Sequence, residues 1–268
     1  MYKTFWNLTN TVKIAKFPTQ GGYKIDIAFC GESRKHVPEF VKEISGYHAV
    51  AAINGGPFQE AQLNSFVTPY FGLFANGDWI TPYSPDANPE EHEVMGKTGR
   101  DNMDNIISIN NGLSMMSKNM IGNLPDLVSS GLTGFRQGYA FSAFREYSSS
   151  GHKLVAVTDP EYGNPENDES IFGRNAQRSL VGLDYSGNIY FISVYGAGNT
   201  PLGGMTGQEL LDFLNSNEVT SQGLMPDVLV NLDGGGSSYL WLAEETDLED
   251  AGPGLRTVTD AVVLYLKD

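Results

Sequence analysis

Apolar and polar residues alternate with a period of two along much of the chain, which is the pattern of β-strands with one buried face. Residues 12–17 and 23–29 follow this pattern, and the Pro-Thr-Gln-Gly-Gly segment between them is typical of a turn. We therefore expect these two segments to form a hairpin. A second hairpin is predicted around Asn76-Gly77, because this dipeptide favours tight two-residue turns.

Other short apolar runs predict further strands, whereas helical spacing is found in only two places. The additional strands are expected at residues 48–53, 71–80, 139–144, 153–157, 178–183, 188–195, 227–232 and 258–266. Residues 37–47 place their apolar side chains on one helical face. Residues 210–214 also have helical spacing, and they come directly after a helix-start pattern at residues 206–209. Because helices and hairpins are intermingled, we expect an α+β fold with a mixed, largely antiparallel β-sheet core and flanking helices.

The chain is long enough for one large domain. Its 268 residues contain no internal repeat and no linker-like segment, so we expect a single domain over residues 1–268. Residues 84–136 are the least patterned and read as loops and short elements. A variable insertion is therefore expected around residues 84–170.

Composition and charge limit the binding partners and the cellular location that we expect. The formal net charge of -15 disfavours non-specific binding to nucleic acids or anionic membranes. The only cysteine, Cys30, excludes an intramolecular disulfide and suits a reducing compartment. The N-terminal residues lack a long apolar segment, and no stretch reaches the roughly 18 apolar residues of a membrane span. We expect a cytoplasmic protein, or a secreted one if a signal peptide was removed.

The strongest candidate for chemistry follows the apolar run at residues 228–232. Asp233 comes first, and the segment continues with Gly234, Gly235, Gly236, Ser237 and Ser238. A strand that ends here delivers a carboxylate to a sheet edge, and bare backbone N–H groups of successive glycines can form an anion-binding nest. A glycine-rich turn capped by Asp233 explains the same residues equally well. No lysine follows the glycines, so this is not a P-loop.

Three further segments carry polar residues at the ends of predicted elements. Asn54 and Gly55 follow an apolar strand, where Asn54 can hold a sugar hydroxyl or a phosphate oxygen, or form an Asx-turn. Arg178 begins a strand and can supply a bidentate phosphate contact, or a surface ion pair. Thr206 and Glu209 have the spacing of a capping box, which explains both without any function.

Taken in order, these segments resemble the phosphodiester glycosidase family over about residues 24–266. The matching motifs are Asn54-Gly-Gly-Pro-Phe58, Gly72-Leu73 with Asn76-Gly77, Arg178-Ser-Leu-Val-Gly182, Gly204-Met-Thr-Gly-Gln-Glu-Leu210, Leu232–Ser238 and Arg256-Thr-Val-Thr-Asp-Ala261. Each motif is short, and their ordered set is specific. Pro57 departs from the family pattern, and residues 84–170 contain no motif that matches.

The resemblance implies a hydrolase that cleaves a sugar-1-phosphodiester, including one within a nucleotide or sugar nucleotide. It implies carboxylate roles for Asp233 and Glu209 and an orienting role for Asn54 and Thr206. The implied phosphate-binding and substrate-binding set comprises Gly55, Arg178, Gly234, Gly235, Gly236, Ser237 and Ser238. Such a reaction passes through an oxocarbenium-like transition state, and stabilising the departing phosphate matters more than protonating it.

The expected partner is a small sugar-phosphodiester or nucleotide-like molecule, and the scheme needs no metal. The acidic segment with Asp159, Glu161, Asp168 and Glu169 offers calcium-type ligands without the spacing of a dedicated calcium loop. The main alternative is a non-catalytic binding protein that sequesters a sugar nucleotide or nucleotide signal, because a fold does not fix a function. A phosphodiesterase that attacks phosphorus instead of carbon is a second alternative, and a carbohydrate-recognition module is a third.

Overall fold

The computed structural model of the chain consists mainly of antiparallel β-sheets. It describes residues 1–6, 10–18, 22–31, 33–58, 69, 73–81, 105–110, 112–116, 129, 131–138, 141–148, 151–158, 172–196, 203–244 and 256–268. Sixteen strands and two α-helices lie in this part of the chain. The structure is mostly β, with 55% of the described residues in strands and 13% helical, so the predicted α+β class with flanking helices is wrong.

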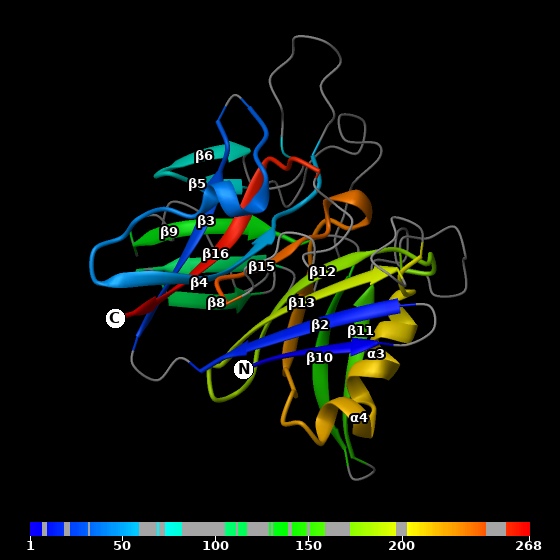
Figure 1. Cartoon of the computed structure of the whole chain (residues 1–268). Coiled ribbons are helices and arrows are strands. Elements are labelled where there is room, and N and C mark those ends of the chain that lie inside the picture. The colour runs from blue at the N-terminus through cyan, green and yellow to red at the C-terminus, as the bar shows by residue number, and fades with distance from the viewer. Residues whose placement is uncertain are drawn as a thin grey trace.

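The largest sheet has seven strands and curls into a half-barrel (Figure 1). Its order is β1 (Tyr2–Trp6), β2 (Asn10–Phe17), β13 (Ile189–Gly196), β12 (Arg178–Leu183), β14 (Val228–Asn231), β10 (Phe141–Ser148) and β11 (Gly151–Thr158). The helices α3 (Gly207–Asn215) and α4 (Asn217–Thr220) cover one face, where Leu210 and Leu214 pack with Leu180 and Ile192. The other face contributes Val181 and similar residues to the core between the sheets.

Two smaller sheets complete the described part of the fold. The four-stranded sheet has the order β15 (Leu240–Leu242), β4 (Tyr47–Asn54), β16 (Asp260–Lys267) and β3 (Tyr23–Phe29). The five-stranded sheet has the order β6 (Asp78–Thr81), β5 (Leu73–Ala75), β9 (Leu132–Gln137), β7 (Asn105–Ile109) and β8 (Gly112–Met116). Two 3-10 turns, η1 (Val37–Phe40) and η3 (Gly235–Ser237), stand near strand ends. The sheets share one apolar core, which fixes the strand ends firmly in place.

The structure confirms one of the two predicted hairpins. The hairpin at Asn76-Gly77 is confirmed, with φ of 55° and 86° at the two turn residues. The predicted hairpin between residues 12–17 and 23–29 is wrong, because β2 pairs with β1 and β13 whereas β3 pairs with β16. An alternating pattern specifies a strand and its buried face, but it leaves the partner strand open.

The predicted helix at residues 37–47 is also wrong. Only the short 3-10 turn η1 forms there, and the chain then continues into β4. Val37 and Phe40 are buried in the core cluster under this turn, so their apolar character serves packing without a helix. Three strands of the five-stranded sheet lie between residues 105 and 137, most of it in the stretch that the sequence left without pattern. No helix in the described ranges is long and apolar enough to cross a bilayer.

Candidate active site

The ends of strands from two sheets meet around Asn54, the last residue of β4. Its side-chain Nδ2 donates to the carbonyl of Asp233 at 3.0 Å, and its Oδ1 accepts from the Ser179 hydroxyl at 2.6 Å and the Tyr239 N–H at 3.1 Å. The side chain is fully buried. Asn54 therefore joins β4, β12 and the loop after β14, and these contacts give it a role in shaping the site.

Asp233 lies at the centre of this junction and is only partly buried. Its N–H donates to the Gly55 carbonyl at 3.0 Å, and its Oδ1 accepts from the Gly234 N–H at 2.9 Å. Burial raises the pKa of Asp233, and the Ser237 hydroxyl, the Gly234 N–H and the Arg256 charge offset this only in part. A group with this pKa can exchange a proton with a substrate or a water closer to neutral pH than an ordinary aspartate can.

The triple-glycine loop is less open to an anion than its sequence suggested. The N–H groups of Gly235, Ser237 and Ser238 donate to carbonyls of Gln177, Gly234 and Gly235. Within the described residues, the Gly236 N–H is the loop amide for which no hydrogen bond is recorded. The loop therefore offers one backbone amide to a ligand, not a row of them.

Two hydroxyls in the same loop are buried. The Oγ atoms of Ser237 and Ser238 are buried and form no hydrogen bond in the described part of the chain. The Ser237 hydroxyl lies near the Asp233 carboxylate and lowers its pKa. Buried hydroxyls without partners are costly, and a ligand that accepts or donates hydrogen bonds here would relieve that cost.

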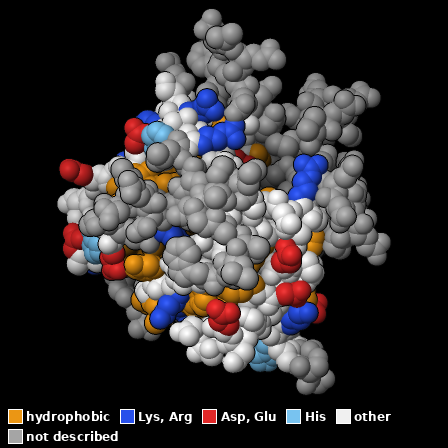
Figure 2. All heavy atoms as spheres, turned by 45° about the vertical axis from the view of Figure 1, so that its right-hand side comes forward, with side chains coloured by type: hydrophobic (Ala, Val, Ile, Leu, Met, Phe, Trp, Pro, Cys, Tyr) orange, Lys and Arg blue, Asp and Glu red, His pale blue; other side chains and the backbone are white. Residues whose placement is uncertain are grey.

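Two exposed arginines lie around Phe58, and one of them also borders the loop. The guanidinium carbon of Arg256 is 5.3 Å from the Phe58 ring centroid, and that of Arg34 is 5.7 Å from it. A Cβ placed on Gly236 would lie 3.6 Å from Cδ of Arg256, so this arginine borders the loop. In Figure 2, some Lys and Arg side chains lie close together in the upper part of the face shown, and others are spread over the rest of it. Arg256 was predicted only as part of a matching motif, and Arg34 was not predicted.

Arg178 faces away from this junction. Ser179 points toward Asn54, and successive strand residues point to opposite faces, so Arg178 lies on the α3 side of the sheet. Its Nε donates to the Met205 carbonyl at 2.8 Å and its Nη2 to the Arg174 carbonyl at 2.8 Å. Burial lowers the pKa of Arg178 to about 10. These contacts tie the segment before β12 to the start of α3.

Thr206 and Glu209 form the predicted capping box. The Glu209 N–H donates to Oγ1 of Thr206 at 3.1 Å, and the Thr206 N–H donates to Oε2 of Glu209 at 2.8 Å. The Glu209 carboxylate is exposed, and its charge raises the pKa of Arg178 against the larger effect of burial. No contact between Glu209 and Asp233 is recorded among the described residues. The capping contacts therefore account for both residues.

A buried ion pair supports the turn after β4, and the sequence analysis did not find it. Nε of Arg136 lies 2.8 Å from Oδ2 of Asp260, and neither side chain is exposed. The Gly56 N–H donates to the same Oδ2 at 3.1 Å, and the Gly55 N–H donates to the Asp260 carbonyl at 2.8 Å. A Cβ on Gly55 would collide with the Asp260 carboxylate, and one on Gly56 with the Arg136 guanidinium. Glycine is therefore required at both positions, because the Asp260 and Arg136 side chains leave no room for a Cβ.

Metal ligands are not brought together in the parts of the chain that the structure describes, where no group of three or more His, Cys, Asp or Glu could hold an ion. The acidic residues that offered calcium-type ligands, Asp159, Glu161, Asp168 and Glu169, lie outside the described residues. The expectation that no metal is needed stays a prediction.

Comparisons with known proteins bear on the whole chain. A model of the phosphodiester glycosidase family matches residues 47–265. No curated protein sequence matches significantly. Among solved structures, the catalytic domain of zebrafish N-acetylglucosamine-1-phosphodiester alpha-N-acetylglucosaminidase is similar, with a TM-score of 0.51 and 15% identity over 100% of this chain and 82% of that chain.

Two bacterial structures are more distant. A putative exported protein from Burkholderia pseudomallei K96243 has a TM-score of 0.49 and 12% identity, over 95% of this chain and 74% of that chain. A hypothetical protein from Synechocystis has a TM-score of 0.46 and 15% identity, over 100% of this chain and 64% of that chain. At such identities, structural likeness concerns the fold alone.

Proposed function

Because the chain belongs to the phosphodiester glycosidase family, we propose that it hydrolyses a sugar-1-phosphodiester to a free sugar and a phosphate monoester. The observation that carries this proposal is Asp233, a carboxylate whose pKa is raised by burial, in one loop with the buried hydroxyls of Ser237 and Ser238. N-acetylglucosamine is the first sugar to test, since the zebrafish enzyme named above acts on its 1-phosphodiester.

In the proposed reaction, the oxygen of a water molecule bonds to the anomeric carbon while the bond from that carbon to the phosphate oxygen breaks. The electron pair of the broken bond leaves with the phosphate oxygen, and the ionised Asp233 accepts the proton of the attacking water. Asp260 is the other carboxylate whose charge affects the pKa of Asp233, but it is fully buried in an ion pair with Arg136. Asp233 is therefore the assigned base, and the phosphate departs without a protein acid, because it is already a good leaving group.

The departing phosphate is assigned to Arg256, the Gly236 N–H and the hydroxyls of Ser237 and Ser238. A guanidinium forms charge-assisted hydrogen bonds with phosphate, and donors fixed before the reaction stabilise charge as it develops. Arg256 borders the loop, whereas the Arg178 guanidinium donates to backbone carbonyls on the α3 side. This assignment replaces Arg178 by Arg256.

The test is turnover of the methyl phosphodiester of N-acetylglucosamine 1-phosphate, followed by detection of the free sugar. Wild type should release sugar, and Asp233→Asn should lose activity by about 10²–10⁴-fold, as expected when a general base is removed. Asp212→Asn, an exposed aspartate on α3, serves as the control and should behave as wild type. Tight binding without turnover by the wild type would support the binding-protein alternative instead.

A further inference from the structure

The turn that follows β4 is held by Asp260, and Asp233 is bonded to that turn. The Gly55 carbonyl accepts a hydrogen bond from the Asp233 N–H at 3.0 Å. The Gly55 N–H donates to the main-chain carbonyl of Asp260 at 2.8 Å, and the Gly56 N–H donates to its Oδ2 at 3.1 Å. The position of the Asp233 main chain therefore depends on a turn that Asp260 fixes at two points.

Arg136 on β9 holds the same turn from the five-stranded sheet. Its Nη2 donates to the Pro57 carbonyl at 3.2 Å, and its Nε donates to Oδ2 of Asp260 at 2.8 Å. The Thr259 hydroxyl donates to Oδ1 of Asp260 at 2.8 Å, and the side chains of Arg136, Thr259 and Asp260 are all fully buried. A guanidinium is planar and its donors have a fixed fork geometry, so these contacts define where the turn lies relative to β9 and β16.

Asp260 also acts on Asp233 through its charge. Burial has the largest effect on the pKa of Asp233, and the Asp260 charge raises that pKa further. The Ser237 hydroxyl, the Gly234 N–H and the Arg256 charge lower it. One buried side chain thus affects both the position of the Asp233 main chain and the proton affinity of its carboxylate.

The groups around Asp260 decide how strongly its charge is felt. Arg136 is the cation in direct contact with it, at 2.8 Å. The Cys30 thiol is also close, because the Asp260 charge raises the pKa of that thiol, whereas the charges of Lys35 and Arg34 lower it. The contact with Arg136 neutralises Asp260 most directly, so a change at either member of this pair alters the field at the loop.

We propose that Asp260 is a positioning residue for Asp233: it fixes the turn to which the Asp233 main chain is bonded, and together with Arg136 it sets the charge around the Asp233 carboxylate. The inference rests on the proposed function, because this role affects turnover only if Asp233 is the base. Asp260 is fully buried, so it acts on the reaction through Asp233 and not by touching the substrate.

The first experiment is an NMR titration of the Asp233 carboxyl carbon in the full chain, labelled with carbon-13 in its aspartate side chains. The Asp233 signal is identified by its absence from Asp233→Asn. Asp260→Asn removes a negative charge and leaves the Arg136 cation, so the pKa of Asp233 should fall by a fraction of a unit or more. Since ionised Asp233 is the base, the acid limb of kcat/KM should also move to lower pH.

Arg136→Lys separates position from charge. Lysine keeps a cation opposite Asp260, but it lacks the fork that binds Asp260 and the Pro57 carbonyl together. Displacement of the turn should lower kcat for the methyl phosphodiester of N-acetylglucosamine 1-phosphate by about tenfold, and the acid limb should stay in place. Both charges of the pair remain, so this variant tests the proposal even where Asp260→Asn fails to fold.

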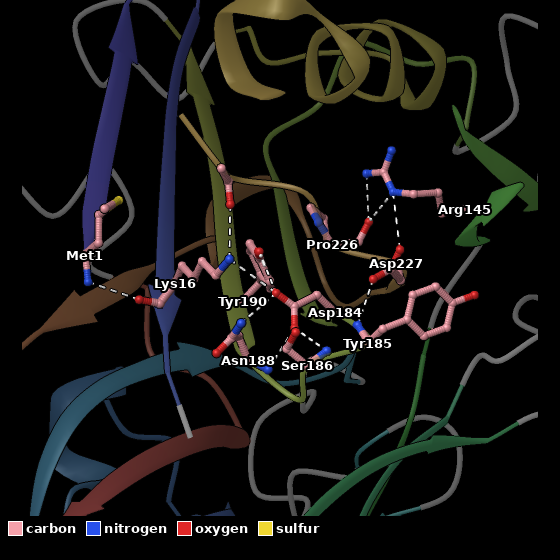
Figure 3. A network of polar contacts seen from close by, with 11 residues as sticks. Met1, Lys16, Arg145, Asp184, Tyr185, Ser186, Asn188, Tyr190, Pro226 and Asp227 are labelled. Atoms are coloured by element: carbon pink, nitrogen blue, oxygen red, sulfur yellow. Dashed lines mark hydrogen bonds and ion pairs between the residues drawn. The ribbon is translucent and has the colours of Figure 1, made fainter. Parts of the chain in front are cut away.

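Asp227→Asn is the matched control for the loss of a buried aspartate. Asp227 lies 3.4 Å from Nε of the buried Arg145, in the network of Figure 3, and it precedes β14 whereas Asp233 follows that strand. This variant breaks a similar ion pair at the other end of β14, so it should leave the titration of Asp233 and the acid limb unchanged.

The outcomes separate this inference from the proposed function. An unchanged pKa of Asp233 in folded Asp260→Asn, or an unchanged kcat in Arg136→Lys, overturns the positioning role while the hydrolase stands. Equal shifts of the Asp233 titration in Asp260→Asn and Asp227→Asn overturn it too. A lowered pKa in Asp260→Asn alone, in a chain that hydrolyses no sugar ester, keeps the coupling between the two carboxylates and removes the hydrolase.

Discussion

Asp184 and Asp233 are aspartates at two different turns of the fold, and their surroundings are opposite. Asp184 follows β12 and belongs to the polar network of Figure 3. Its carboxylate accepts from the Ser186 N–H at 3.0 Å, the Asn188 N–H at 2.9 Å, Nδ2 of Asn188 at 2.8 Å and the Tyr190 hydroxyl at 3.1 Å, and it pairs with Lys16 at 3.2 Å. Burial alone would raise the pKa of Asp184, but these donors outweigh it and the pKa is lowered.

The Asp233 carboxylate accepts a hydrogen bond from the Gly234 N–H, and the Ser237 hydroxyl also lowers its pKa, but burial keeps that pKa raised. The comparison shows that donor count decides whether a partly buried carboxylate is held ionised or left ready to take up a proton. Asp184 stabilises a hairpin end. Asp233 has fewer donors and shares its loop with two buried hydroxyls, which is how groups at functional sites commonly differ from structural ones.

The largest expected contrast is in activity. Asp233→Asn should lower kcat for the methyl phosphodiester of N-acetylglucosamine 1-phosphate by about 10²–10⁴-fold. Asp184→Asn should leave kcat within about twofold of wild type and lower the free energy of unfolding by about 1–2 kcal/mol, because donors lose their charged acceptor. Steady-state kinetics and urea denaturation measure the two effects. Similar kcat losses in both variants would remove the distinction between the two carboxylates.

The buried ion pair beneath the site gives the largest expected change in stability. Arg136→Met leaves the Asp260 charge buried without its partner and should lower the free energy of unfolding by about 3–5 kcal/mol. The exposed pair of Lys42 and Asp26, at 2.9 Å, is the comparison, and Lys42→Met should cost less than about 1 kcal/mol. Urea denaturation of both variants checks the difference. Equal effects would mean that the Arg136–Asp260 ion pair contributes little to the free energy of unfolding.

Stability should respond to pH in opposite directions at the two aspartates. The pKa of Asp233 is raised above the ordinary 3.8, so its charge destabilises the folded chain increasingly as pH rises from about 4 through the raised value. Asp233→Asn should therefore raise Tm by a few degrees at neutral pH and by almost nothing below pH 4. The pKa of Asp184 is lowered, so its stabilising contribution is present above 3.8 and is lost as pH falls through the lowered value. Thermal unfolding across pH checks both signs, and a lower Tm of Asp233→Asn at neutral pH would contradict them.

The smallest expected effect concerns the pH dependence of activity. The Arg256 charge lowers the pKa of Asp233, so Arg256→Gln should raise that pKa further. If ionised Asp233 is the base, activity is lost as pH falls through its pKa, and the acid limb of kcat/KM should move to higher pH by a fraction of a unit. Lys24→Gln should leave the limb in place. A limb that moves to lower pH in Arg256→Gln would contradict the assignment.

The sequence predicted most strands but could not predict how they pair. β2 and β3 follow the alternating pattern and are joined by a turn signal, yet they belong to different sheets, because pairing is decided by the whole core. Residues 37–47 have helical apolar spacing, but β4 begins at Tyr47 and only η1 forms before it. Short apolar runs cannot distinguish a helix face from a packed turn.

The site was predictable where its residues are neighbours in the chain. Asp233, the glycines and the two serines stand together in one segment, and a strand end followed by glycines is a local signal. The Arg136–Asp260 pair joins residues 124 positions apart, and nothing local links them. Arg178 and Arg256 both stand near strand starts, so only the structure distinguishes the face that each one uses. The run Arg34-Lys35-His36 in an acidic chain was the one available signal for the basic group around Phe58.

Hydrolysis of the methyl phosphodiester of N-acetylglucosamine 1-phosphate in oxygen-18 water tests the central claim most directly. Attack at the anomeric carbon with Asp233 as the base predicts that one oxygen-18 atom enters the released sugar and none enters the phosphate ester, and that Asp233→Asn nearly abolishes the labelled sugar. Label in the phosphate would place the attack on phosphorus, and labelled sugar formed at the wild-type rate by Asp233→Asn would remove this carboxylate from the reaction.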